Sequence, residues 1–113
     1  MHELGIAQEM IKIALDYAAK QNARNVMQFN IEMSAAADEN EDSLRFHIEN
    51  LARGTAAAGA LVEITRVPVD AKCLDCGNQF VMQTSNAGCP RCSGQRVRSL
   101  VRDEFRLVSI EVE

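Results

Sequence analysis

Four cysteines stand in two close pairs, Cys73 with Cys76 and Cys89 with Cys92. Two residues separate the members of each pair, and twelve residues separate the pairs. A two-residue gap lets the chain turn back so that both sulfurs face one ion, and four thiolates around Zn²⁺ make a closed tetrahedral site. A catalytic zinc site would need an open coordination position, and the segment contains no candidate for a fifth ligand. The spacing therefore predicts a structural zinc site and not a catalytic one.

The residues around the cysteines support the same interpretation. Gly77 and Gly94 follow the two pairs, where such turns often need a positive φ. Lys72, Arg91 and Arg96 can offset the net negative charge of four thiolates on one zinc ion. A redox dithiol and an iron–sulfur cluster are the alternatives. So small a module cannot hold a core alone, so metal binding is expected to supply much of its folding energy.

The sequence contains two histidines, His2 and His47. His47 falls on the apolar side of an expected helix, where a hydrogen-bonded packing role is predicted. His2 lies next to the amine of Met1, and deprotonated amine, amide and imidazole nitrogens can close chelate rings in one plane. Such square-planar sites favour Ni(II) or Cu(II), and Glu3 adds a further amide. An exposed histidine without a metal is the alternative.

Hydrophobic periodicity predicts the elements that position these residues. Helical spacing is expected over 4–20 and 44–52, strand patterns over 27–33, 61–67 and 105–112, and an acidic loop over 35–42. Gly54 suits a helix C-terminal cap. Since helices need a sheet face to cover, we predict an α+β fold: a small three-stranded mixed sheet covered by two helices, with an inserted zinc-ribbon module.

Charge changes where the cysteines begin. Residues 1–71 carry eleven acidic residues against six basic ones, whereas residues 72–106 carry six basic residues against three acidic ones. We therefore place a boundary near Asp70. The predicted domains are 1–70 with 103–113, an α/β domain that includes His2, and 71–102, the zinc ribbon.

Composition excludes several classes of function. A net charge of −4 argues against a primary nucleic-acid binder, and no apolar run approaches the roughly 20 residues of a membrane helix. The start lacks a signal peptide, so a cytoplasmic location is expected, where thiols stay reduced. Neither a nucleophile with a positioned base nor a phosphate-binding glycine loop is visible, so the chain is not expected to be an enzyme.

The whole chain resembles a known family, the hydrogenase nickel-incorporation proteins (HypA/HybF). The resemblance covers nearly all 113 residues in order. It rests on the two cysteine pairs and on these stretches: Met1-His2-Glu3-Leu4, Ile6-Ala7, Leu44-Arg45-Phe46, Gly54-Thr55, Gly59-Ala60 and Ser109-Ile110-Glu111-Val112-Glu113. The stretch Glu32-Met33-Ser34-Ala35-Ala36-Ala37 departs from the family's glycine-containing turn, so the backbone there can differ.

The resemblance implies a nickel metallochaperone that serves maturing [NiFe]-hydrogenase and, in some bacteria, urease. Carried onto this chain, Ni²⁺ is a transient cargo held by His2 with backbone nitrogens of Met1 and Glu3. Structural Zn²⁺ is held by Cys73, Cys76, Cys89 and Cys92. The implied partners are a GTPase of the same pathway and a hydrogenase large-subunit precursor. Neither nucleic acid nor membrane is expected as a partner, and the chain is expected to be a monomer or a weak homodimer.

A function of another class is kept as the alternative, a zinc-ribbon adaptor that binds nucleic acid or a transcription complex. It is motivated by five arginines: Arg91, Arg96, Arg98, Arg102 and Arg106. A solvated ribbon face that also balances the thiolates explains the same residues. The acidic net charge and the scarcity of aromatic residues for stacking favour this second explanation.

Overall fold

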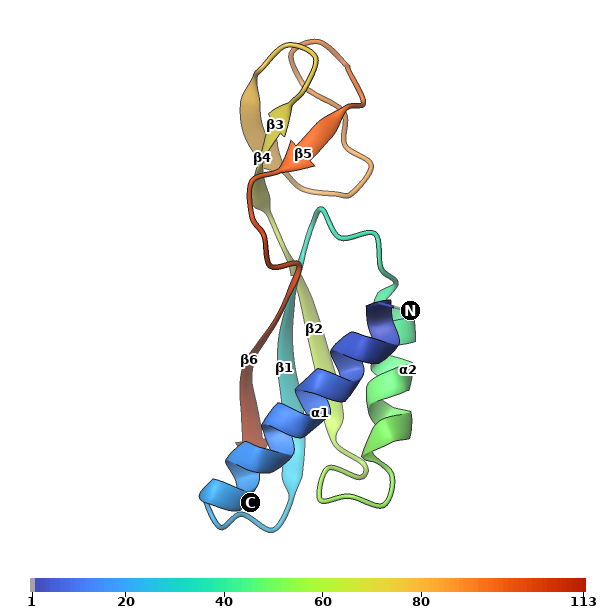
Figure 1. Ribbon diagram of the computed structural model, residues 1–113, viewed down its shortest axis with the longest axis vertical. Coiled ribbons are helices and arrows are strands. Elements are labelled where there is room, and N and C mark those ends of the chain that lie inside the picture. Colours follow the sequence, from blue (N-terminus) through green and yellow to red (C-terminus); the bar gives the residue numbers. More distant parts are fainter. Residues whose placement is uncertain (1) are drawn as a thin grey trace. The chain divides into compact units, whose positions relative to one another are not determined.

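The computed structural model describes residues 2–113, except for the side chain of His2. Its elements follow in the order α1 (His2–Lys20), β1 (Val26–Ser34), α2 (Glu41–Ala52), β2 (Leu61–Val67), β3 (Val69–Cys73), β4 (Gln79–Met82), β5 (Val97–Ser99) and β6 (Phe105–Val112) (Figure 1). The strands form two sheets, ordered β2-β1-β6 and β4-β3-β5. The α+β fold class is confirmed.

The chain forms two compact units. The first consists of Met1–Glu32, Glu39–Thr65 and Leu107–Glu113, and the second of Met33–Asp38 and Arg66–Arg106. The sequence-based domain boundaries at residues 71 and 103 stay a prediction. Within residues 2–113, no helix combines the length and the apolar composition that a membrane span requires.

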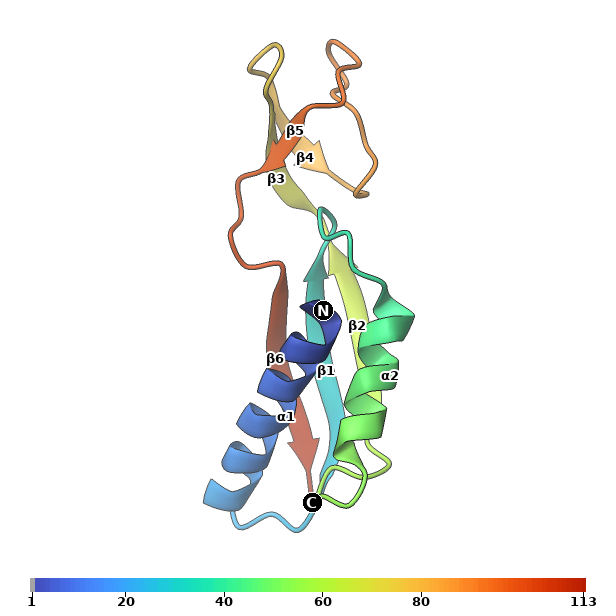
Figure 2. The same ribbon diagram turned by 45° about the vertical axis from the view of Figure 1, so that its right-hand side comes forward.

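The β2-β1-β6 sheet is mixed, as predicted. The N–H of Val26 donates to the carbonyl of Ala56, which precedes β2, and β1 and β2 point the same way in Figure 2. The N–H of Arg24, which precedes the start of β1, donates to the carbonyl of Glu113, which follows the end of β6. The start of one strand therefore lies beside the end of the other, so β1 and β6 run antiparallel. A parallel pair needs a crossover connection, and α2 provides it between β1 and β2.

Both helices lie against the sheet in the first unit, next to one another (Figures 1 and 2). Their buried residues recur at helical spacing, as the sequence predicts: Ala7, Met10, Ile11, Ala14 and Ala18 from α1, with Leu44, Ile48 and Ala52 from α2. Phe29 and Ile31 of β1 are also buried. The core is therefore mostly aliphatic, and its largest fully buried side chain is the aromatic Phe29.

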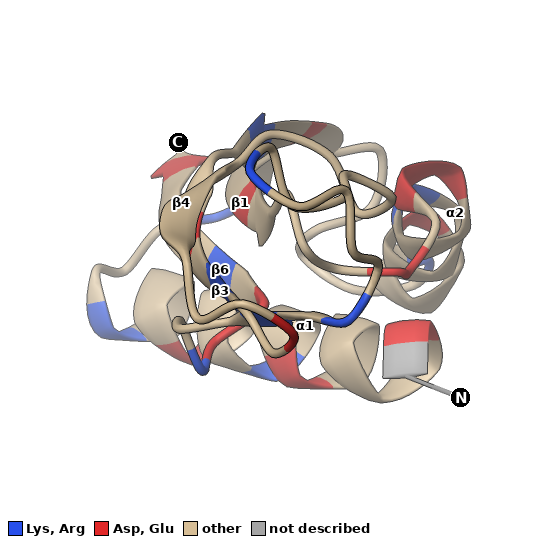
Figure 3. Ribbon diagram, turned by 90° about the horizontal axis from the view of Figure 1, so that it is seen from above, with Lys and Arg blue, Asp and Glu red and all other residues tan. Residues whose placement is uncertain are grey.

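Helix α2 begins earlier than the sequence analysis placed it. The side-chain oxygen of Asn40 accepts the N–H groups of Asp42 and Ser43 at 2.8 and 3.1 Å, which satisfies donors that a helix start leaves unpaired. Glu41 and Asp42, predicted to lie in a loop, are in the first turn, where acidic side chains suit the helix dipole (Figure 3). Gly54, with a φ of +75°, ends the helix as predicted.

The second unit is built on the antiparallel strands β3, β4 and β5. Alternate residues of β3 point inward, so Val69 and Ala71 are buried together with Met82 of β4. Phe80, Val97 and other half-buried residues pack against this cluster. The sequence analysis predicted the ribbon from its cysteines and did not predict these three short strands.

The loop predicted over 35–42 is present over residues 35–40, and residues 33–38 belong to the second unit. Ala36 packs against the ribbon's buried cluster, and Ala35 and Ala37 are buried. Nη1 of Arg66 donates to the carbonyls of Ser34 and Ala37 at 3.3 and 3.1 Å. Small alanine side chains let this turn lie close to its neighbours, and the arginine satisfies carbonyls that would otherwise be buried without a partner.

Candidate metal centre

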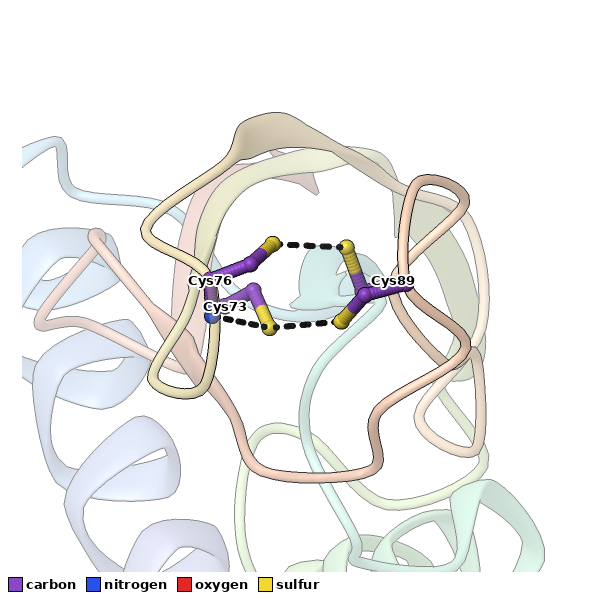
Figure 4. A group of neighbouring side chains, drawn as sticks. Cys73, Cys76 and Cys89 are labelled. Carbon is purple, nitrogen blue, oxygen red and sulfur yellow. Dashed lines mark hydrogen bonds between the residues drawn. The ribbon is translucent and has the colours of Figure 1, made fainter.

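The four cysteine sulfurs converge on one point (Figure 4). All four lie within 4.8 Å of one another, with 3.6 Å from Cys73 to Cys92 and 3.7 Å from Cys76 to Cys89. Four sulfurs at about 2.3 Å from a tetrahedral Zn²⁺ lie about 3.8 Å apart, so the spacing fits that ion. A disulfide needs about 2.05 Å, and the structure contains all four as free cysteines.

Two similar turns bring the sulfurs together. In the first, the N–H of Gly77 donates to the carbonyl of Cys73 at 2.9 Å, and in the second the N–H of Ser93 donates to the carbonyl of Cys89 at 2.8 Å. Each turn also directs a backbone N–H at its own leading sulfur: Cys76 N to Cys73 Sγ at 3.5 Å, and Arg91 N to Cys89 Sγ at 3.4 Å. The two halves of the site are therefore near copies.

The second glycine of the site has a different role from the one predicted. Gly77 has a φ of +79°, as expected, but in the second turn the positive φ of 64° belongs to Ser93 and not to Gly94. A Cβ on Gly94 would lie 2.6 Å from Oδ2 of Asp75 and 3.1 Å from Sγ of Cys92. Gly94 is needed because the other turn approaches it closely, not because of its backbone angle.

The thiols do not share one pKa. Burial raises the pKa of Cys89, but the backbone N–H groups of Cys92 and Arg91 outweigh it, and the pKa falls to about 6. The N–H of Gly94 lowers the pKa of Cys92, but hydrogen bonds with the neighbouring thiols raise it to about 12. Backbone N–H groups thus favour the thiolate of Cys89, whereas contacts with the neighbouring thiols keep a proton on Cys92, so full deprotonation of the site meets a conflict. A divalent cation removes that conflict, which supports a metal site.

Backbone N–H groups, more than charged side chains, face the sulfurs. Nη1 of Arg96 donates to Oδ1 of Asp75, a residue of the first turn, at 3.2 Å, so this arginine is paired with a carboxylate and its predicted role in offsetting the thiolate charge stays a prediction. Lys72 neighbours Cys73 in β3 and therefore points to the opposite face of that strand. The sequence analysis missed Asn78, whose side-chain Nδ2 lies 3.8 Å from Cys89 Sγ. In the sequence, the position of Asn78 directly after Gly77 was the signal that could have indicated its closeness to the sulfurs.

The predicted nickel ligands fall partly outside the described residues, namely Met1 and the side chain of His2. The backbone of His2 begins α1. Oε2 of Glu3 accepts the N–H of Asn40 at 3.5 Å. A hydrogen bond with its own backbone N–H is the main cause that lowers the pKa of Glu3. His47 is half-buried, with its ring centroid 5.8 Å from that of Phe46.

Comparisons with known proteins agree with this arrangement. The family model described as "Hydrogenase/urease nickel incorporation, metallochaperone, hypA" matches residues 1–112. A hydrogenase maturation factor HypA of Dehalococcoides mccartyi strain BAV1 is 35% identical over 113 residues, which cover 100% of this chain and 95% of that protein. A protein of the same name from Acidithiobacillus ferrooxidans is 31% identical over 113 residues, which cover 100% of this chain and 100% of that protein.

Solved structures show the same fold. The solution structure of the Ni metallochaperone HypA from Helicobacter pylori has a TM-score of 0.65 at 19% identity, covering 97% of this chain and 96% of that one. A second solution structure of a HypA protein has a TM-score of 0.69 at 21% identity, covering 100% and 97%.

The chain belongs to the HypA family of hydrogenase/urease nickel-incorporation metallochaperones. It is a maturation factor and not an enzyme, as the sequence analysis predicted.

Proposed function

We propose that this chain carries Ni²⁺ to a maturing [NiFe]-hydrogenase and holds a separate, structural Zn²⁺ at Cys73, Cys76, Cys89 and Cys92. The zinc assignment rests on the distances between the cysteine sulfurs: two pairs lie 3.6 and 3.7 Å apart, and all four sulfurs lie within 4.8 Å of one another. Four thiolates close the coordination shell of zinc and leave no position for exchange. The nickel cargo therefore needs another site.

The proposed nickel site uses the amine of Met1, the amides of His2 and Glu3, and the His2 imidazole. Helix α1 starts at His2, so these amides belong to the first turn, where N–H groups have no acceptor within the helix. Deprotonating them costs no helical hydrogen bond. Four nitrogens in one plane suit Ni(II), whereas zinc gains nothing from that geometry. Because binding releases protons, nickel affinity should rise with pH.

A helical backbone cannot place these nitrogens in one plane. Nickel binding is therefore expected to unwind the first turn of α1 and to break the hydrogen bond from Asn40 to Glu3. The cost of this change keeps affinity below that of a preformed site, which suits a carrier that must release its ion.

The proposal includes partners that a carrier requires. A GTPase of the same pathway and a hydrogenase large-subunit precursor are the proposed donor and acceptor, and urease is a further possible acceptor. A cytoplasmic location fits four cysteines held as free thiols.

Nickel titration by calorimetry, on protein with its native start, tests this proposal. His2→Ala should abolish nickel binding, while the control His47→Ala should change the affinity by less than about twofold. An N-terminal tag should act like His2→Ala because it converts the amine to an amide. Zinc content should stay constant in all variants. Unchanged nickel binding by both the tagged protein and His2→Ala would place the ligands elsewhere.

A further inference from the structure

The strand register of the ribbon brings two cations side by side. Lys72 of β3 is the direct partner of Arg98 of β5, and on its other side Lys72 is paired with Gln79 of β4. Direct partners in an antiparallel sheet point to the same face. Ala71 and Cys73, the neighbours of Lys72 in β3, are buried on the inner face. Lys72 and Arg98 therefore share the outer face, which is defined by Asp70, Lys72, Gln79, Val81 and Arg98.

This arrangement is unfavourable by itself. Like charges directly opposite one another destabilise a sheet. Arg96 differs, because Asp75 neutralises it at 3.2 Å. Among residues 2–113, neither Lys72 nor Arg98 has an ion pair with an acidic side chain. Asp70 is the carboxylate of the outer face, but its direct partner is Val81 and not a cation.

Charge balance at the metal does not require this pair. Side chains of the outer face point away from the sulfurs, which receive N–H groups from the backbone of the turns instead. The cationic pair lies beside an apolar side chain, Val81, which is 54% exposed. Adjacent cations with an exposed apolar neighbour form a surface that carboxylates and an aliphatic contact complement.

We propose that the outer face of the ribbon sheet docks an acidic segment of a partner protein. This goes beyond the proposed nickel and zinc functions, neither of which uses these side chains. Nucleic acid fits less well, because the outer face presents no aromatic side chain on which a base could stack. The ribbon's one aromatic residue, Phe80, packs against the inner cluster and is not available for stacking.

Fluorescence anisotropy with a labelled oligoglutamate peptide tests the proposal on the full chain. The variant Lys72→Glu/Arg98→Glu should weaken binding by about tenfold or more, because each attraction becomes a repulsion. The matched control Lys12→Glu/Lys20→Glu makes the same change of charge on α1, where both lysines are exposed, and should change binding by less than about twofold. The peptide affinity of the neutral variant Lys72→Gln/Arg98→Gln should lie between the affinities of the charge-reversed ribbon variant and the α1 control.

Zinc content, measured for every variant, separates this proposal from the metal assignment. A ribbon variant that keeps its zinc and loses the peptide supports the docking face. Equal losses in the ribbon and control variants would show a general charge effect and overturn the proposal. Tighter binding of a single-stranded oligonucleotide, lost in the same ribbon variant, would assign the face to nucleic acid. Self-association of the chain that this variant abolishes would assign it to a second copy.

Discussion

The two units of this chain depend on different sources of stability. In the first, two helices bury aliphatic residues against a sheet, and Phe29, Ile31, Leu44 and Ile48 are all fully buried. In the second, the buried cluster of the ribbon sheet is only Val69, Ala71 and Met82, with half-buried residues around it. Such a cluster is too small to order a chain whose conformational entropy opposes folding. Under the proposed zinc assignment, coordination at the sulfurs replaces the missing core, so the two units should respond differently to the same kind of damage.

The largest expected effect is the loss of one sulfur. Cys89→Ala should release the metal, because three thiolates no longer close the site, and structural zinc contributes on the order of 10 kcal/mol to small domains. We expect amide resonances of the ribbon to collapse to unfolded positions while those of α1 and α2 remain. Metal analysis and two-dimensional NMR measure both effects. Retained zinc would disprove the ligand set, and melted helices would mean that the units fold together.

A core change in the first unit should produce the opposite pattern. Leu44 is fully buried, so Leu44→Ala should lower the free energy of unfolding by about 2–5 kcal/mol. Circular dichroism during heating should show the helices melting earlier, with one zinc ion retained per chain. Phe46→Ala is the control within the same helix. Phe46 is 61% exposed, and its replacement should cost no more than about 0.5 kcal/mol.

The smallest effects should distinguish the two similar turns of the metal site. Gly77→Ala places a side chain at a φ of +79° and should destabilise the ribbon by about 1–2 kcal/mol. Ser93→Gly relieves a φ of 64° and should stabilise it by about 0.5 kcal/mol, because the extra freedom of glycine in the unfolded chain offsets part of the gain. Zinc competition against a chelator measures both changes. Two shifts of the same sign would contradict the turn geometry.

Sequence patterns predicted the larger elements well and the local geometry less well. The strands at Leu61–Val67 and Phe105–Val112 were predicted with their observed bounds, since their apolar residues stand out from the flanking segments. The start of α2 was missed, because the cap is formed by hydrogen bonds that the Asn40 side chain accepts and not by a hydrophobic signal. Ser93 was missed because the position in the turn, and not the residue type, imposes its backbone angle. The three alanines of residues 35–37 carry no periodicity, so nothing in the sequence showed that Ala35 and Ala37 are buried or that Ala36 packs against the ribbon cluster.

Ala36 packs against the ribbon cluster, and Arg66 donates to the carbonyls of Ser34 and Ala37. These contacts have a consequence for the evolution of the sequence. The ribbon is not an independent module, because part of its packing comes from residues 33–38, which precede the first cysteine by more than thirty residues. Recombination that exchanged only 71–102 between two relatives would leave the alanine turn and its arginine facing a foreign surface. Residues 33–38 and 66–106 are therefore expected to vary together during evolution, and a working chimera should transfer both segments at once.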